Sequence, residues 1–403
     1  PVWNGELYLE YHRGTYTSVG QNKRYNRKSE LLYQELECFC SLAALLGQPY
    51  PSDEIRSGWE TILLNQFHDI LPGSSIREVY EESWKQYDEV LLRGERLRER
   101  ALAAIRREMA LPGDSVVVFN SLSFPRTEAA FVRLPAGLPL PVLLDGDDRP
   151  VALQVVAEDV PGQPAVPGEG PLAILCARDV PARGHLGFRL GAPSGDTMAI
   201  PGESMHIAPD RMENDYFRIL LDERGAFVSV YDKAAGREVL PPGQRGNVLQ
   251  AFEDRPLRFD NWDIDVYYRE KMWEMADDVR IEAVETGPVR GRLRIERRFL
   301  DSVAVSHVCL YAEIPRIDFH TEIDWREDRI LLKAAFPVDI LADKATYDIQ
   351  FGNVERPTHR NTSWDMARFE VCAHRWADLS EDGYGVSLLN DCKYGHDIRD
   401  GVM

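Results

Sequence analysis

The chain has 403 residues, of which 66 are acidic and 47 basic, giving a net charge of −19. An excess of negative charge of this size argues against nucleic acid and an anionic membrane surface as partners, because both would repel it. No apolar run approaches the roughly 18 residues of a membrane-spanning helix, and the start of the sequence shows no signal peptide. The length predicts two to four domains.

The six cysteines are spread along the sequence without the CxxC spacing of a metal or redox motif. They are Cys38, Cys40, Cys176, Cys309, Cys372 and Cys392. We expect reduced thiols that pack as small apolar groups, and we therefore expect the protein in the cytoplasm.

The N-terminal part carries mostly helical patterns. Residues 1–22 alternate polar and aromatic side chains and fit a strand or extended loop, whereas apolar residues recur at helical spacing over 23–46. A second helix is expected to begin after Ser52 as its N-cap and to end at Pro72–Gly73, and a third covers about 75–110. Three long helices with short connections predict an antiparallel bundle.

At Pro112 the pattern changes to short β-rich runs separated by Pro and Gly, which is typical of a sandwich. A soft boundary rich in Gly, Pro and Ser falls at Gly191–Met205. The expected fold class is therefore α+β and multidomain, with a three-helix bundle over 1–111, a small β domain over 112–205 and a large β-sandwich over 206–403.

Two adjacent polar residues, His68 and Asp69, stand in an otherwise apolar stretch just before Pro72–Gly73. Burying an imidazole beside a carboxylate costs free energy unless other groups pair with them. The pair could be a surface dipeptide or a core histidine bonded to a backbone carbonyl.

The run LLNQFHDILPGSSIREVYEES resembles the internal signature of the family 38 glycoside hydrolases, the class II α-mannosidases. The upstream run GELYLEYHRGTYTSVGQNKRYNRKSELL is similar to the segment that precedes this signature in the bacterial and cytosolic members. The resemblance implies that His68 ligates a catalytic zinc ion and that Asp69 contacts sugar hydroxyls. It also implies a large β supersandwich of the galactose mutarotase-like type over 206–403.

The loop that contains His12, Arg13 and Tyr16 offers hydrogen-bond donors and a flat ring, as a sugar site needs, although a surface turn has the same composition. In the family that it resembles, this loop lines the mannose pocket. We therefore expect these three residues to contact substrate.

The stretch RFDNWDIDVYYREKMW places Asp260, Trp262 and Asp263 together. A Trp ring can stack on sugar C–H groups while carboxylates accept hydroxyl protons, but an Asp-capped turn beside a core Trp is equally compatible. The stretch resembles the FDxWDID run of bacterial mannosidases, which favours a sugar-contacting loop. His359, His374 and His396 match no zinc spacing and are expected to be structural.

A retaining glycosidase needs two carboxyl groups about 5 Å apart, and a catalytic zinc needs about three protein ligands. In the family, the nucleophile, the acid/base and the other zinc ligands lie in an N-terminal α/β domain that no part of this chain resembles. We therefore expect that this chain contains no catalytic residue and is an inactive fragment of a retaining exo-α-mannosidase. Its expected partners are the missing N-terminal domain and an α-mannoside oligosaccharide. The alternative is a non-catalytic carbohydrate-binding or scaffolding protein; homo-oligomer formation is left open.

Overall fold

The computed structural model describes residues 2, 5–112, 115–136, 142–157, 166, 168–191 and 205–403. Most of the expected boundary at Gly191–Met205 lies outside these residues. The chain forms two compact units, each discontinuous in sequence. Unit 1 comprises Pro1–Met109, Ala251–Trp273 and Arg329–Met403, and unit 2 comprises Ala110–Gln250 and Glu274–Asp328.

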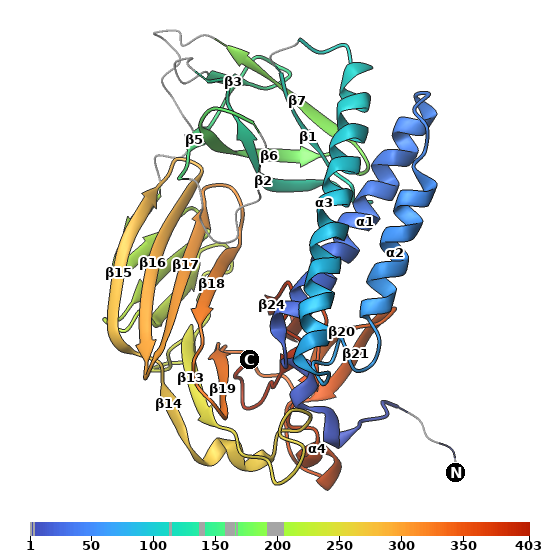
Figure 1. Ribbon diagram of the computed structural model, residues 1–403. Helices are drawn as coiled ribbons and strands as arrows, with labels where there is room; N and C mark the ends of the chain where they lie inside the picture. The colour runs from blue at the N-terminus through green and yellow to red at the C-terminus, as the bar shows by residue number, and fades with distance from the viewer. Residues whose placement is uncertain are drawn as a thin grey trace. The chain divides into compact units, whose positions relative to one another are not determined.

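Unit 1 contains a bundle of three helices, α1 (Gly20–Leu45), α2 (Ser52–Asn65) and α3 (Arg77–Arg107), which lie side by side (Figure 1). Their apolar faces form the bundle core, as helical spacing predicts. The core includes Leu32, Tyr33, Leu36, Phe39, Ile55, Ile62, Tyr87, Val90 and Leu97. Helix α2 approaches α1 closely at Gly58, where a Cβ atom would stand 2.0 Å from the Tyr33 ring. A side chain at this position would therefore force the helices apart.

The end of α2 differs from the sequence prediction. The helix ends at Asn65, and the chain continues through irregular turns to Gly73, although Phe67 and Leu71 extend the apolar pattern. The side-chain Nε2 of Gln66, the C-cap residue, donates to Asn26 Oδ1 (3.0 Å) and Glu30 Oε1 (2.8 Å) on α1. These tertiary bonds fix the chain where it leaves the helix. Ser52 is the first helical residue rather than the N-cap.

The rest of unit 1 begins with two short 3-10 turns, η1 (Glu10–His12) and η2 (Gly14–Tyr16), in place of an N-terminal strand. It also contains η3 (Val266–Glu270), β19 (Ile330–Ala335), β20 (Lys344–Ile349), β21 (Gly352–Pro357), α4 (Ser363–Ala367), β22 (Val371–Cys372), β23 (Trp376–Glu381), β24 (Tyr384–Leu389) and β25 (Gly395–His396). Strands β21-β20-β23-β24 form one sheet and β22-β25 another. Strands β13 (Val248–Glu253) and β14 (Met272–Glu274) carry the chain between the units and form a sheet in the order β14-β13-β19.

Unit 2 contains antiparallel sheets that pack as sandwiches. The first pair of sheets has the strand orders β1-β7-β3-β4 and β2-β6-β5, and the second pair β12-β11-β10-β9-β8 and β15-β16-β17-β18. The strands of the first pair are β1 (Ser115–Phe119), β2 (Arg126–Arg133), β3 (Val142–Leu144), β4 (Pro150–Val151), β5 (Leu153–Val155), β6 (Leu172–Val180) and β7 (His185–Gly191). Those of the second pair are β8 (His206–Ala208), β9 (Arg211–Glu213), β10 (Phe217–Leu221), β11 (Phe227–Asp232), β12 (Arg237–Glu238), β15 (Asp277–Thr286), β16 (Arg290–Phe299), β17 (Ser302–Tyr311) and β18 (Ile317–Asp324).

Apolar side chains that alternate along β16 and β17 form part of the core of the second sandwich. Leu293 and Ile295 share one face with Val308 and Leu310, and all four are buried in one apolar core. Arg294, on the other face, pairs in register with His307 of β17. The period of two therefore directs the apolar side chains to the sandwich core, although His307 on the other face is also buried.

The predicted fold class is confirmed: a helical bundle is followed by β-sheets, and among the described residues beyond 206 only α4 and η3 are helical. The two compact units do not follow the three expected ranges, because 251–273 and 329–403 associate with the helices. Contacts so distant in sequence leave no local pattern that could predict them.

Candidate functional site

His68 and Asp69 lie on the turn that follows α2. The His68 side chain is 78% exposed and that of Asp69 is 38% exposed, and His68 Nε2 stands 3.5 Å from Asp69 Oδ2. Of the two interpretations raised by the sequence, burial in the core is therefore excluded. With most of its surface exposed, the imidazole is accessible to a ligand.

The backbone under this pair is firmly held. The carbonyl of Asp69 accepts hydrogen bonds from Ser75 Oγ (2.8 Å) and Tyr80 OH (3.2 Å), and the hydroxyl of Ser74 donates to Asp69 Oδ1 (3.2 Å). Tyr80 is 5% exposed and belongs to α3. The turn that carries the exposed pair is therefore held in place by hydrogen bonds from Ser75 and from Tyr80 of α3. Little further ordering of this turn is needed when a ligand binds.

Three segments distant in sequence meet beside this turn. The Gly14 amide donates to the Trp262 carbonyl (2.8 Å), Ser18 Oγ donates to the Asn261 carbonyl (3.0 Å), and Asn261 Nδ2 donates to the Gly73 carbonyl (2.8 Å). Gly73 has φ +93°, and a Cβ there would lie 2.6 Å from the Ser18 carbonyl oxygen. This position therefore requires glycine for both its backbone conformation and its close packing.

His12, Trp262 and Asp260 line the accessible part of this junction. The rings of His12 and Trp262 meet edge to face at 4.9 Å, and both are partly exposed. The Asp260 side chain is 65% exposed and lies 3.7 Å from Arg329. The structure therefore brings the two sequence clusters, around residue 12 and around residue 262, into direct contact. Their contact with sugar stays a prediction.

Arg13 and Asp263 behave differently from their neighbours. Arg13 is 6% exposed and donates to Asp263 Oδ1 (3.1 Å), Tyr8 OH (3.1 Å) and the Ala367 carbonyl (2.9 Å). Asp263 is also 6% exposed and accepts from the Ile264 amide (2.8 Å). Because both side chains are buried and bound to protein, they hold loops together, and their contact with sugar stays a prediction.

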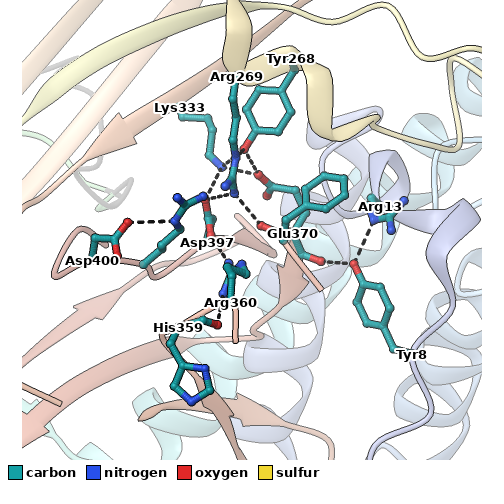
Figure 2. Close-up of polar contacts among 12 residues, drawn as sticks. Tyr8, Arg13, Tyr268, Arg269, Lys333, His359, Arg360, Glu370, Asp397 and Asp400 are labelled. Carbon is teal, nitrogen blue, oxygen red and sulfur yellow. Dashed lines mark hydrogen bonds and ion pairs between the residues drawn. The ribbon is translucent and has the colours of Figure 1, made fainter. Parts of the chain in front are cut away.

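Figure 2 shows how Arg13 connects to a buried polar cluster. Tyr8 OH donates to the Glu370 carbonyl, and the Glu370 carboxylate accepts from Lys333 and from Tyr268 OH. Burial, partly offset by Arg13, raises the pKa of Tyr8 to about 12. We call Tyr8, Arg13, Tyr268, Lys333 and Glu370 the buried cluster. Its members satisfy one another, which indicates a structural role.

Tyr16 belongs to neither the exposed junction nor the buried cluster. It is partly buried in η2, and its Cβ lies near Gly395. Burial raises its pKa, and the groups that act on it electrostatically include Cys372 and Arg356. The ring therefore faces the C-terminal strands, and its contact with substrate stays a prediction.

Among the residues that the structure describes, no three His, Cys, Asp or Glu side chains form a metal-binding group. His396 is 8% exposed and bonds to the Tyr394 carbonyl (3.2 Å), and the His374 ring packs against Tyr394 at 5.4 Å. His359 lies 3.6 Å from Asp365. The His68 side chain, 78% exposed, is more open to a ligand than that of His359 (42%), and it stands next to the carboxylate of Asp69.

Sequence reasoning missed Lys23, Asn261 and Gly73 as parts of the junction. Lys23 stands in the run NKRYNRK, which has the composition of a solvated helix face, so nothing marked it. Asn261 and Gly73 lie next to residues that the sequence analysis did select. Their position within the same motifs could have indicated that they belong to the junction.

Comparison with known proteins assigns the class. Residues 10–105 match the α-mannosidase middle domain, and residues 212–403 match the C-terminal domain of glycosyl hydrolases family 38. The chain belongs to glycosyl hydrolase family 38, as the sequence resemblance predicts.

Individual relatives agree. The chain is 34% identical to human alpha-mannosidase 2C1 and 33% identical to alpha-mannosidase G of Dictyostelium discoideum, over 100% and 99% of its length. It spans 36% and 38% of these two proteins. A solved alpha-mannosidase from Enterococcus faecalis V583 shares the fold, with a TM-score of 0.74 and 17% identity over 97% of this chain and 51% of that one.

Of the helices in the described part of the chain, none is both long and apolar enough to cross a membrane. All six cysteines are free thiols.

Proposed function

We propose that this chain forms the helical and β-rich part of a zinc-dependent, retaining exo-α-mannosidase that removes terminal α-mannose from oligosaccharides. His68 serves as one zinc ligand and Asp69 as an acceptor for sugar hydroxyls. The remaining zinc ligands, the nucleophile and the acid/base come from other parts of the enzyme. The cytoplasm remains the expected location.

The observation that carries this proposal is the exposed His68–Asp69 pair on a partly buried turn whose backbone is held by side-chain hydrogen bonds. A surface histidine without function needs no such support. The pair also falls within the residues that match an α-mannosidase middle domain.

The chemistry of the two side chains suits these roles. An exposed, neutral imidazole can bind a borderline-soft cation through a ring nitrogen. Zinc bound there would supply a Lewis acid for substrate hydroxyls and for charge that develops during bond cleavage. Asp69 lies close enough to His68 to accept hydroxyl protons next to the metal, and Ser74 fixes the orientation of its carboxylate.

The test uses the complete enzyme that contains this chain, with zinc content and aryl α-mannoside turnover measured for His68→Ala. Outer-shell residues of metal sites typically contribute 10- to 100-fold, so loss of a ligand should cost about 100-fold or more in kcat/KM and most of the bound zinc. Stability should change little, because the side chain is 78% exposed. His206→Ala, an exposed histidine in unit 2, is the control. Full zinc and normal turnover in His68→Ala would overturn the proposal.

The chain by itself should hydrolyse aryl α-mannosides no faster than background. One or two ligands do not complete tetrahedral zinc, so it should also bind zinc weakly. If the isolated chain bound mannose oligosaccharides tightly without zinc, the alternative of a carbohydrate-binding or scaffolding protein would be favoured.

A further inference from the structure

The polar groups that support the His68–Asp69 turn include one buried ammonium group. Lys23 lies in the first turn of α1 and is 3% exposed. Its Nζ donates to the carbonyls of Ser18 (2.6 Å), Leu71 (2.9 Å) and Pro72 (3.2 Å). A lysine ammonium has three protons, so this group uses all of its donors on backbone carbonyls.

The three carbonyls belong to two different segments. Ser18 ends the loop that contains His12 and Tyr16, whereas Leu71 and Pro72 end the turn that begins with His68 and Asp69. Lys23 therefore joins the two segments through buried hydrogen bonds. Asn261, which is exposed, joins the same segments through its bonds with Ser18 and Gly73.

Burying a lysine is costly, and within the described part of the chain no carboxylate accepts a hydrogen bond from Lys23. Burial, together with nearby Lys393, lowers the pKa of Lys23 to about 7. Its three carbonyl acceptors favour the charged form in return. A methionine or leucine would fill the same space without this cost, so packing alone does not explain a lysine at this position.

We infer that Lys23 is a positioning residue of the active site: it fixes the turn that presents His68 and Asp69 relative to the sugar-contacting loop that ends at Ser18. This inference rests on the proposed function, because it assigns Lys23 to the same site. Lys23 does not touch substrate or metal; it acts through the two backbone segments that it ties together.

The experiment compares Lys23→Met with Lys28→Met in the complete enzyme. Lys28 lies on the same helix but pairs with Asp391 at the surface, with its side chain 44% exposed. Lys23→Met should lower zinc affinity and kcat/KM by about 10- to 100-fold, the range of outer-shell effects at metal sites. Added Zn²⁺ should restore part of the turnover, because the ligand itself is still present. Lys28→Met should behave as the parent enzyme.

Asn261→Ala keeps the test decisive if Lys23→Met folds poorly. Asn261 is exposed, so its truncation should leave the unfolding midpoint unchanged while reducing kcat by several-fold. Parent-like zinc affinity and kcat in folded Lys23→Met, or in Asn261→Ala when the first variant does not fold, would overturn the inference. An inactive, zinc-free parent enzyme would instead overturn the proposed function, so the two failures are distinguishable.

Discussion

The buried cluster and the His68 turn both place charged side chains in unit 1, but they treat them in opposite ways. In the cluster, Glu370 is 3% exposed and accepts from Lys333 and Tyr268. On the turn, His68 is mostly exposed and has Asp69 as its neighbour. Complete pairing marks groups that hold the fold, whereas exposed groups on a rigid base are available for chemistry.

Glu370→Leu tests this contrast most strongly. The Glu370 carboxylate offsets the cost of burying Lys333 and raises the pKa of that lysine, and the variant removes this carboxylate. Lys333 then keeps only the more distant carboxylate of Asp397, 4.0 Å away. The variant should therefore cost about 3 to 4 kcal/mol in the free energy of unfolding, measured with urea. Glu355→Leu removes the partner of Lys344 in an exposed pair and should cost less than about 1 kcal/mol. Equal losses in the two variants would show that the cluster is not the structural element described.

Asp69→Asn tests the other region of this contrast, the exposed His68 turn. In the complete enzyme it should retain zinc and stability but lose about 10- to 100-fold in kcat/KM for aryl α-mannosides, because hydroxyl contacts weaken while the bond from Ser74 can persist. Zinc content, unfolding midpoint and turnover are the three measurements. Asp382→Asn, an exposed carboxylate in another turn, is the matched control. A destabilised Asp69→Asn with unchanged turnover per folded molecule would contradict the assignment.

A buried histidine makes unit 1 sensitive to acid. Burial lowers the pKa of His396 to about 4, against about 6.5 in an unfolded chain. The neutral ring therefore stabilises the fold fully above pH 6.5, and this contribution is lost as the pH falls towards 4. The loss should be on the order of 3 kcal/mol, since each pKa unit corresponds to about 1.4 kcal/mol. In His396→Phe, urea unfolding between pH 7 and 4 should show a shallower pH dependence; an unchanged slope would refute this.

The smallest effect is expected for Tyr8→Phe. The change removes a hydroxyl that accepts from Arg13 and donates to the Glu370 carbonyl, yet it keeps the ring. The loss should be about 1 to 2 kcal/mol in unfolding free energy, typical of a buried hydrogen bond. Tyr11→Phe, with a residue 60% exposed, should be neutral. If both variants unfold alike, the Tyr8 hydroxyl does not support the cluster.

The sequence was informative where structure depends on local pattern. Helical spacing predicted the bundle, and the change at Pro112 predicted the β regions. It failed at the end of α2, because Gln66 is held by Asn26 and Glu30, residues that lie far away in the sequence.

In the candidate site too, contacts between residues far apart in the sequence could not be predicted from local pattern. His68 and Asp69 were found through the resemblance of their motif, and their exposure required the structure. Asp260 and Asp263 occupy one motif, yet one is exposed and the other is buried against Arg13. Their difference depends on a contact some 250 residues away, which composition and spacing do not encode.

The discontinuity of unit 1 has a consequence for how the protein is made. Arg13 leaves the ribosome long before Asp263 and the segment that carries Glu370, which follow 250 and 357 residues later. At about 5 to 20 residues per second, the second interval lasts roughly 20 to 70 seconds. During synthesis the helices can form early from local contacts, while the N-terminal loop waits for its partners. Nascent chains are thus most exposed to chaperones and proteases at this loop. A chain that ends near residue 250 would leave Arg13 with Tyr8 but without Asp263 and the Ala367 carbonyl.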